Sequence, residues 1–239
     1  MNHPETAQSL GQVLDATILA MASLAEPGEA GGHILRTQHY VRALALKLKA
    51  TPAYAELMSD QYIAALFMAA PWHDIGNAGV PDRILLKPAA LTDEELAIIK
   101  THPLIGRNTI EQIQRVAGVT MAFLDTAKEI AYCHQERWDG SGYPQGLAGE
   151  SIPVAARLMA IADAYDALTT RRVYRGDVPH HVAVQQIFQQ RAAHFAPDMV
   201  DAFIEIQDEF LAIAQRYADT DVDFQKKIDY LAKAIAESP

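Results

Sequence analysis

The chain has 239 residues, half of them hydrophobic and 21% charged, which is the composition of an ordinary globular protein. This length suffices for one large domain or two small ones, and either would bury a sizeable core. The formal net charge of −10 disfavours broad electrostatic binding to DNA or RNA, so no nucleic-acid polymer is expected as a partner. A local basic pocket for a small phosphate ligand stays compatible with that charge.

The cysteine content and the apolar runs indicate where such a protein works. Cys133 is the one cysteine, so no internal disulfide can form, as suits a reducing compartment. The opening MNHPETAQSL lacks the basic and apolar regions of a secretion signal. No uncharged apolar run approaches the roughly 18 residues that a membrane span needs. We therefore expect a cytoplasmic protein that is not inserted in a membrane.

Apolar residues recur at helical spacing along almost the whole chain. The pattern predicts helices over residues 9–26, 33–48, 62–74, 91–106, 121–136, 154–172, 180–193, 198–217 and 222–236. A capping box from Thr92 to Glu95 opens the fourth helix, and Pro103 should end or kink it near His102. Because alternating apolar and polar residues are scarce, strands should be absent or minor. The fold class is therefore all-α, with a helical extension over 1–26 and one domain over 27–239.

Histidines and carboxylates recur at the predicted helix ends, beside helix-breaking residues. In HDIGNAGVPDRILLKP, the pair His73 and Asp74 fits either a metal site or a buried histidine beside a helix-end carboxylate. Similar candidates on other helices are Glu29, His33, His102, His134, Asp163 and Asp166. Imidazole and carboxylate are ligands that iron, manganese and zinc accept. A lone histidine is more often a hydrogen-bonded core or surface residue, which is how we interpret His3, His39, His180, His181 and His194. The recurrence of the other candidates favours a metal centre.

Several longer motifs carry a family resemblance. The stretches HDIG, PDRILLKP, LTDEEL, KTHPLIG, ERWDGSGYP and IADAYDALTTRRVYR resemble the HD-GYP family, a branch of the HD-domain metal-dependent phosphohydrolases. The similarity runs from about Glu29 to about Val200. It implies an all-helical fold of the HD type and a bacterial signalling function. It also implies a centre of two or three metals, usually iron or manganese, and hydrolysis of cyclic di-GMP.

The resemblance also implies roles for the candidate metal ligands. One metal would be held by His33, His73, Asp74 and Asp163. Asp74 would bridge to a second metal, held also by His102 and His134. Glu29 matches an acidic residue associated with a third metal, which we expect less than the other two. Asp166 resembles a carboxylate that orients the metal-bound water, so Asp74 and Asp166 are the expected catalytic residues.

Substrate contacts are implied in the same way. Tyr143, in the Gly-Tyr-Pro signature, and the basic residues Arg172 and Arg175 match positions that contact the substrate or its phosphate. The chemistry agrees, because two metals roughly 4 Å apart can share an acidified water and neutralise a phosphodiester. Arginines add bidentate phosphate contacts. Without the upstream histidines, the glycine-rich loop would be interpreted as a connector and the arginines as a solvated helix end.

Two positions depart from the family pattern. Asn77 replaces a lysine thought to contact substrate phosphate, so binding or transition-state stabilisation should weaken there. Gln135 replaces a metal-binding histidine, and a neutral amide is a poorer ligand for a transition metal. The neighbouring Cys133 is interpreted as a buried apolar residue in preference to a substitute ligand.

These departures leave three interpretations open. The favoured one is a cyclic di-GMP phosphodiesterase with two metals, because the six core ligands are present together. The second is a degenerate member that binds a cyclic dinucleotide or partner proteins with little catalysis. The third is a hydrolase of another cyclic dinucleotide, such as cyclic GMP-AMP. The first predicted helix could pack on the core or mediate a homodimer. Binding of the chain to another signalling protein is a further possibility.

Overall fold

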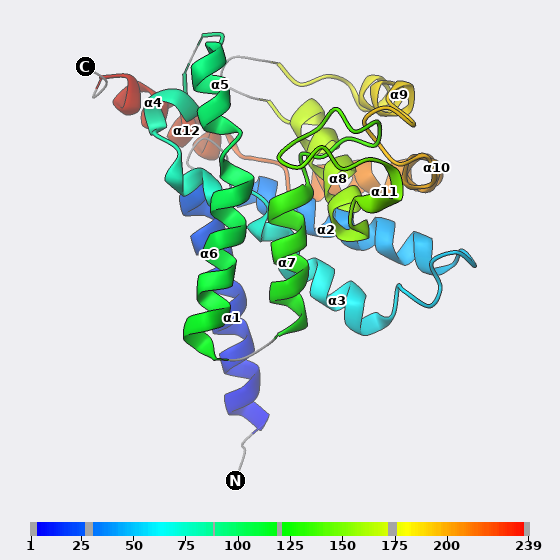
Figure 1. The fold of residues 1–239 in the computed structure, drawn as a ribbon. Coiled ribbons are helices and arrows are strands. Elements are labelled where there is room, and N and C mark those ends of the chain that lie inside the picture. The colour runs from blue at the N-terminus through cyan, green and yellow to red at the C-terminus, as the bar shows by residue number, and fades with distance from the viewer. Residues whose placement is uncertain (1–3, 27–30, 88, 119–120, 172–175, 237–239) are drawn as a thin grey trace.

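A computed structural model describes residues 4–26, 31–87, 89–118, 121–171 and 176–236 (Figure 1). The long helices are α1 (Pro4–Ala25), α2 (Gly31–Lys49), α3 (Asp60–Ala69), α6 (His102–Ala117), α7 (Ala122–Cys133), α8 (Val154–Thr169), α9 (His180–Gln189), α10 (Pro197–Glu205), α11 (Gln207–Arg216) and α12 (Asp221–Ala236). Shorter turns are η1 (Ala70–Trp72), η2 (Ile75–Gly79), α4 (Asp82–Leu85), α5 (Asp93–Ile99) and η3 (Gly149–Ser151). Over these ranges the only β pairing is an isolated bridge between Arg191 and Phe195. The all-α prediction is confirmed.

The helix boundaries show where prolines and backbone breaks act. The capping box of Thr92 and Glu95 is present at the start of α5. That helix ends at Ile99, and Pro103 lies in the first turn of α6, where a missing amide hydrogen costs nothing. The prediction of one helix over 198–217 is wrong, because Ile206 has φ −119° and ψ 17° and separates α10 from α11.

The core is built on α2 and α8. Fully buried aromatic rings join them to α10 and α11, with Tyr40 stacked on Phe210 at 4.4 Å and Tyr165 edge-on to Phe210 at 5.2 Å between ring centroids. On the other side of this core, α3 and α7 pack together, and η1 contacts both α2 and α7. This packing brings the start of α2, the turns η1 and η2, the start of α6 and the end of α7 into one neighbourhood.

A glycine allows the closest of these approaches. A Cβ added at Gly76, in η2, would lie 1.9 Å from the carbonyl oxygen of His102 and 2.6 Å from the amide nitrogen of Gly106. Backbone atoms cannot yield to such a clash, so η2 and the first turns of α6 can touch only because residue 76 has no side chain. The glycine of the HDIG motif thus holds Asp74 close to His102.

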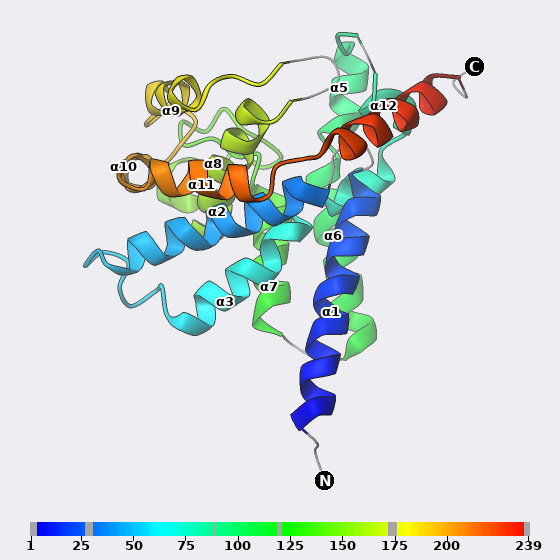
Figure 2. The same cartoon turned by 180° about the vertical axis from the view of Figure 1, so that it is seen from behind.

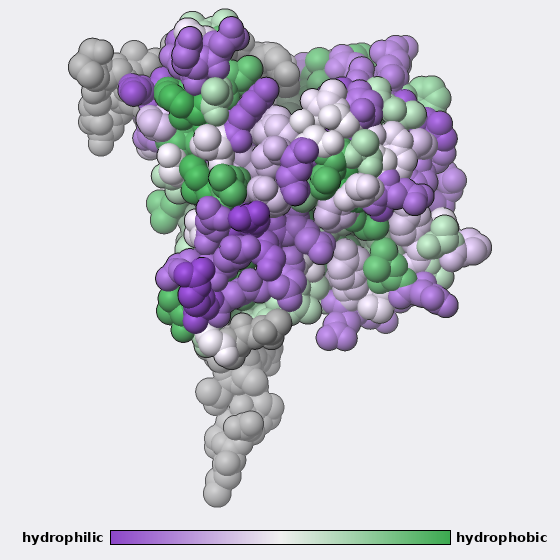
Figure 3. Space-filling view, viewed as in Figure 1, coloured by the Kyte–Doolittle hydropathy of each residue, from purple (hydrophilic) through white to green (hydrophobic). Residues whose placement is uncertain are grey.

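At the surface, one end of α1 projects from the molecule and the outward faces of α6 and α7 are hydrophilic. The N-terminal half of α1 projects beyond the remaining helices in both views (Figures 1 and 2). Its C-terminal half is anchored by the buried residues Ile18, Ala22 and Ala25. The outward faces of α6 and α7 are hydrophilic (Figure 3), with Gln112 and Glu129 among their exposed residues. In the part of the chain that the structure describes, no helix is both long and apolar enough to cross a membrane.

Candidate metal centre

Four buried histidines come from four different helix ends. His33 lies in the first turn of α2, His73 directly follows η1, His102 opens α6, and His134 directly follows α7. Each residue is between 1% and 3% exposed. Helix ends carry free backbone groups that hold a neighbouring side chain in place. The sequence expectation that these residues converge is therefore met for all four histidines.

Backbone carbonyls fix the orientation of three of these imidazoles. The Nδ1 atom of His73 lies 3.1 Å from the Ala70 oxygen, that of His102 lies 2.8 Å from the Ile99 oxygen, and that of His134 lies 3.0 Å from the Ile130 oxygen. Because a carbonyl only accepts hydrogen bonds, each Nδ1 must carry the hydrogen. Each neutral ring therefore presents the lone pair of Nε2 to the centre, which is the tautomer of a metal ligand.

A buried ion pair fixes the fourth imidazole. His33 Nδ1 lies 2.7 Å from Asp166 Oδ2, and Arg36 binds both oxygens of the same carboxylate at 2.5 and 3.0 Å. Burial alone would raise the pKa of Asp166, but His33 and Arg36 hold it well below its usual range. Asp166 is therefore ionised and accepts from His33 Nδ1. The resemblance implied that Asp166 orients a water, whereas its contacts in this structure orient His33 and Arg36.

Asp74, His102 and His134 form a first group, which we call the Asp74 trio. Asp74 Oδ1 lies 3.3 Å from His102 Nε2 and 3.2 Å from His134 Nε2, and the two Nε2 atoms are 3.4 Å apart. One ligand atom from each residue lies within 4.8 Å of the others. This grouping agrees with the second metal that the resemblance implied.

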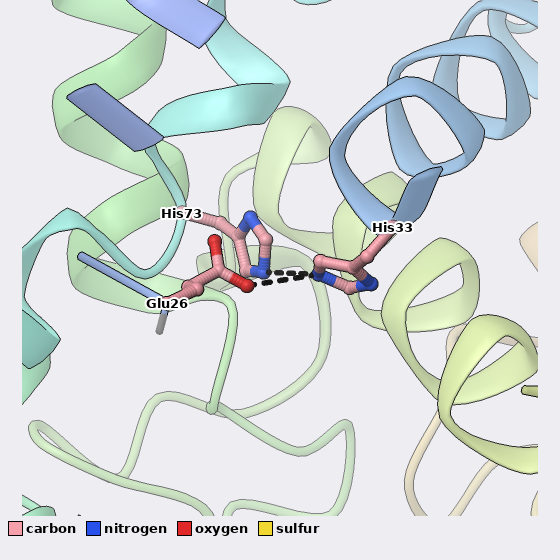
Figure 4. A group of neighbouring side chains, drawn as sticks. All are labelled: Glu26, His33 and His73. Atoms are coloured by element: carbon pink, nitrogen blue, oxygen red, sulfur yellow. Dashed lines mark hydrogen bonds and ion pairs between the residues drawn. The ribbon is translucent and has the colours of Figure 1, made fainter. Parts of the chain in front are cut away.

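Glu26, His33 and His73 form a second group, which we call the Glu26 trio. Glu26 Oε2 and His73 Nε2 lie 3.2 and 3.4 Å from His33 Nε2, and the three side chains point toward one another (Figure 4). Sequence reasoning placed His33 and His73 together but missed Glu26. Its position at the end of the first predicted helix was the same signal that singled out the other candidates.

Asp74 stands between the two trios. Its second oxygen, Oδ2, lies 3.9 Å from His73 Nε2, while Oδ1 faces the Asp74 trio. Its side chain is 23% exposed, in contrast to the buried imidazoles around it. A carboxylate in this position can serve both trios and also face a ligand that arrives from solvent.

The electrostatics of both trios favour a bound cation. Burial would lower the pKa of His33, but Glu26 and Asp166 raise it well above its ordinary value. Burial would also lower the pKa of His134, but Asp74 outweighs burial and raises that pKa. In each trio two Nε2 lone pairs lie 3.4 Å apart and repel each other unless a positive charge lies among them. Nitrogen and carboxylate donors at this spacing fit divalent transition metals.

The remaining predicted ligands lie outside the trios or outside the described residues. Asp163 is half-buried on α8, and its charge helps to raise the pKa of His134 and of Tyr143. It belongs to neither trio. Glu29, Arg172 and Arg175 lie outside the described residues.

The two departures from the family pattern are placed near the centre. Asn77 is buried in η2, where its backbone N–H donates to the Asp74 backbone carbonyl at 2.9 Å. Gln135 is half-buried and directly follows His134. Cys133 is a buried free thiol packed with Ile152, and burial raises its pKa to about 12. A thiol of that pKa is protonated at neutral pH, which supports the interpretation of Cys133 as an apolar residue.

The glycine-rich loop is organised by a carboxylate that sequence reasoning did not single out. Glu136 is 2% exposed and accepts hydrogen bonds from the amides of Gln145 at 2.8 Å and Leu147 at 3.0 Å. The Tyr143 amide donates to the Gln135 carbonyl at 3.2 Å. A Cβ at Gly142 would lie 2.3 Å from the Arg137 nitrogen, so the loop requires glycine there.

This loop presents Tyr143 beside the Asp74 trio. Its ring lies edge-on to His102, with 6.2 Å between centroids, and Lys100 Nζ lies 5.3 Å from the Tyr143 centroid. Lys100 is an exposed cation that sequence reasoning did not select. A tyrosine and a lysine thus border the open side of the metal centre.

The fold and site together define an all-helical domain with a buried histidine–carboxylate metal centre at its helix ends. Comparison with known families agrees, since the family model described as HD domain matches residues 28–199. The chain belongs to the HD domain family, and the resemblance to its HD-GYP branch is confirmed.

Named relatives and a solved structure show the same likeness. The chain is 48% identical over 212 residues to a protein of Vibrio cholerae serotype O1 named probable cyclic di-GMP phosphodiesterase, covering 88% of this chain and 48% of that protein. It is 35% identical to 3′3′-cGAMP-specific phosphodiesterase 2 of the same organism, covering 84% and 36%. A solved cyclic GMP-AMP specific phosphodiesterase of V. cholerae matches its fold with a TM-score of 0.54 and 16% identity, over 95% and 61% of the two chains. The chain thus spans half or less of the length of these two named relatives.

Proposed function

We propose that the chain is a metal-dependent phosphodiesterase that hydrolyses cyclic di-GMP to the linear dinucleotide, to GMP, or to both. The observation that carries this proposal is the pair of histidine–carboxylate trios joined at the partly exposed Asp74. A relative at 48% identity bears the name of this activity. The single buried thiol, Cys133, also fits a reducing cytoplasm.

The cofactors that we propose are two divalent transition metals, iron or manganese, one for each trio. A third ion has less support, because Gln135 stands where the family has a histidine. When bound, such ions acidify a water and neutralise the phosphate. His33, His73, His102 and His134 would hold them, with Glu26 and Asp74 as the carboxylates. We further propose that Asp163, whose charge acts on His134, adds to this set.

The chain's own residues bind and orient the substrate. Tyr143 and Lys100 border the centre, so we assign them to the nucleotide and to one of its phosphates. Arg172 and Arg175 remain proposed phosphate contacts, and Asn77 a weaker one. In the reaction, the water oxygen bonds to phosphorus, the bond from phosphorus to one ribose oxygen breaks, and that oxygen takes up a proton.

A second candidate substrate is cyclic GMP-AMP. The relative named 3′3′-cGAMP-specific phosphodiesterase 2 favours it, since it is 35% identical over 84% of this chain. Both substrates carry the same pair of phosphates, so the metal centre does not discriminate between them. Discrimination would depend on contacts with the second base.

The testing experiment is hydrolysis of both cyclic dinucleotides by protein loaded with Fe²⁺ or Mn²⁺. The proposal expects cyclic di-GMP to be cleaved, with a higher kcat/KM than cyclic GMP-AMP. A reversed preference would favour the second candidate. Binding without cleavage would indicate a degenerate protein. The doubly substituted Asn77→Lys, Gln135→His chain separates these cases, because restored cleavage would show that the two departures had silenced an otherwise complete site.

A further inference from the structure

Glu26 is a buried carboxylate with a partner for only one of its two oxygens among the described residues. Its side chain is 4% exposed, and Oε2 lies 3.2 Å from His33 Nε2. Its other oxygen, Oε1, is buried and has no hydrogen-bond partner among the residues that the structure describes. Burying an ionised carboxylate without partners costs several kcal/mol, so such a group is normally paired or bound to a metal.

Helix α1 determines where this carboxylate lies. The Glu26 amide donates to the Ala22 carbonyl at 3.1 Å, which continues the helical hydrogen bonding one residue beyond Ala25. Ala22 and Ala25 are 2% and 1% exposed, and α1 contacts η1, η2 and α2. The end of α1 is therefore packed near η1 and η2, the two turns between which His73 and Asp74 lie.

We propose that Glu26 is a ligand of the metal held by His33 and His73, so that α1 is part of the metal centre. With Glu26 in place, each trio has one carboxylate and two imidazoles. Glu26 is a different residue from Glu29, which the family resemblance associates with a third metal. The inference rests on the metal centre of the proposed function, and it does not depend on the substrate.

Its consequence is a coupling between α1 and metal occupancy. Any change that pulls the last turn of α1 away from η1 and η2 removes a ligand from the Glu26 trio. The Asp74 trio keeps all of its ligands in that case. Loss of α1 packing should therefore lower metal content by one ion before it unfolds the domain.

The test compares metal content and affinity in full-length Glu26→Gln and Glu29→Gln chains, with the exposed Glu56→Gln as a surface control. Wild type and Glu56→Gln should each bind two Mn²⁺. Glu26→Gln should bind one ion with unchanged affinity and the other at least roughly tenfold more weakly. Glu29→Gln should lose less metal than Glu26→Gln. The reverse order, or two unweakened ions in Glu26→Gln, would overturn the inference while leaving the proposed function intact.

A spectroscopic variant guards against simple misfolding. In Glu26→Cys loaded with Co²⁺, a thiolate at residue 26 bound to cobalt should give a charge-transfer absorption that wild type, whose only thiol is the buried Cys133, lacks. A cobalt-loaded Glu26→Cys chain without that absorption would contradict the proposal. Thermal unfolding of Glu26→Gln in chelator completes the test. If the variant loses metal because a ligand is missing, and not because it misfolds, the metal-free variant must still be folded. Wild type that binds no metal at all would instead remove the proposed function.

Discussion

The Asp74 trio and the Glu26 trio contain the same kinds of ligand, but the fold supplies them differently. In the Asp74 trio, His102 and His134 are each held by a carbonyl three or four residues earlier in the chain. In the Glu26 trio, His33 is held by Asp166, which is 133 residues away, and Glu26 arrives from the end of α1. Both imidazoles of the Asp74 trio are thus held by local backbone contacts. In the Glu26 trio only His73 is held in this way, by the Ala70 carbonyl, while His33 and Glu26 depend on long-range packing.

This difference should affect how tightly each trio binds its metal ion. Ligands fixed by local turns keep their positions whenever those helix ends form. Ligands fixed by distant contacts are lost with any of the elements that supply them. We therefore expect the Glu26 trio to bind its ion more weakly than the Asp74 trio, with Asp74 as the residue that both share.

The largest effect should follow from removal of Asp74. Asp74→Ala takes a carboxylate from between the two trios, so both ions should be weakened and hydrolysis should fall by about 10³-fold, or roughly 4 kcal/mol of transition-state stabilisation. Steady-state kinetics and elemental analysis measure the two losses. The control is Asp15→Asn on the exposed face of α1. An active Asp74→Ala enzyme would break the assumption that the trios act together.

The buried ion pair behind His33 should come next. Asp166→Asn takes from buried Arg36 the carboxylate that binds two of its nitrogens and leaves it Asp219 at 3.1 Å, so the free energy of unfolding should fall by about 3 kcal/mol. The exposed pair of Arg191 with Asp201, at 2.8 Å, offers a matched control, and Asp201→Asn should shift the unfolding midpoint little. Urea unfolding in chelator measures both. Equal effects from the two substitutions would contradict the role given to burial.

The pH dependence of metal binding follows from the raised pKa values of His33 and His134. A raised pKa means that the metal-free rings keep protons above their ordinary range, and a metal ion must displace them. Apparent affinity should therefore rise with pH while these rings still hold their protons, by roughly tenfold per pH unit for each proton released, and level off above the raised pKa values. Calorimetry of Mn²⁺ binding in buffers of different ionisation enthalpy measures the protons. An affinity that does not change with pH would count against this account.

The smallest predicted effect concerns Lys100, which borders the Asp74 trio beside Tyr143. Lys100→Ala should raise KM for cyclic di-GMP by roughly 3–10-fold, because an exposed cation near the phosphate adds modest attraction. Metal content should not change. Lys128→Ala, which breaks a surface pair with Asp125 at 3.6 Å on α7, is the control and should leave KM as it is. An unchanged KM in Lys100→Ala would remove this lysine from the substrate site.

The two trios also differ in how far the sequence predicted them. The Asp74 trio was predicted in full, because its residues belong to motifs that also form the local structure around them. The Glu26 trio was predicted in part: His33 and His73 were chosen, but Glu26 lies seven residues before His33 with no motif between them. Only the packing of α1 brings it inward. Asp166 was assigned to a water because a sequence does not show Arg36 and His33 meeting its carboxylate.

The same limit applies to the fold. Most helices followed from periodicity, and the capping box and Pro103 were predicted with their positions. Residues 107–117 of α6 lay outside the predicted helices. The break at Ile206 was missed because residues 198–217 keep a continuous helical pattern. The break lies where the backbone of Ile206 has φ −119° and ψ 17°, outside the helical region. Local signals thus specify the elements, and long-range contacts specify where they bend.

The most direct test of a two-ion centre with unequal sites is a Mn²⁺ titration of the full-length, chelator-treated protein, with elemental analysis of the loaded product. Our account predicts two ions per chain and two distinguishable affinities, the tighter for the Asp74 trio. It also predicts that Glu26→Gln abolishes or weakens only the second binding step. A single step for one ion in wild type, or two steps that both survive unchanged in Glu26→Gln, would contradict the division of the centre into two trios.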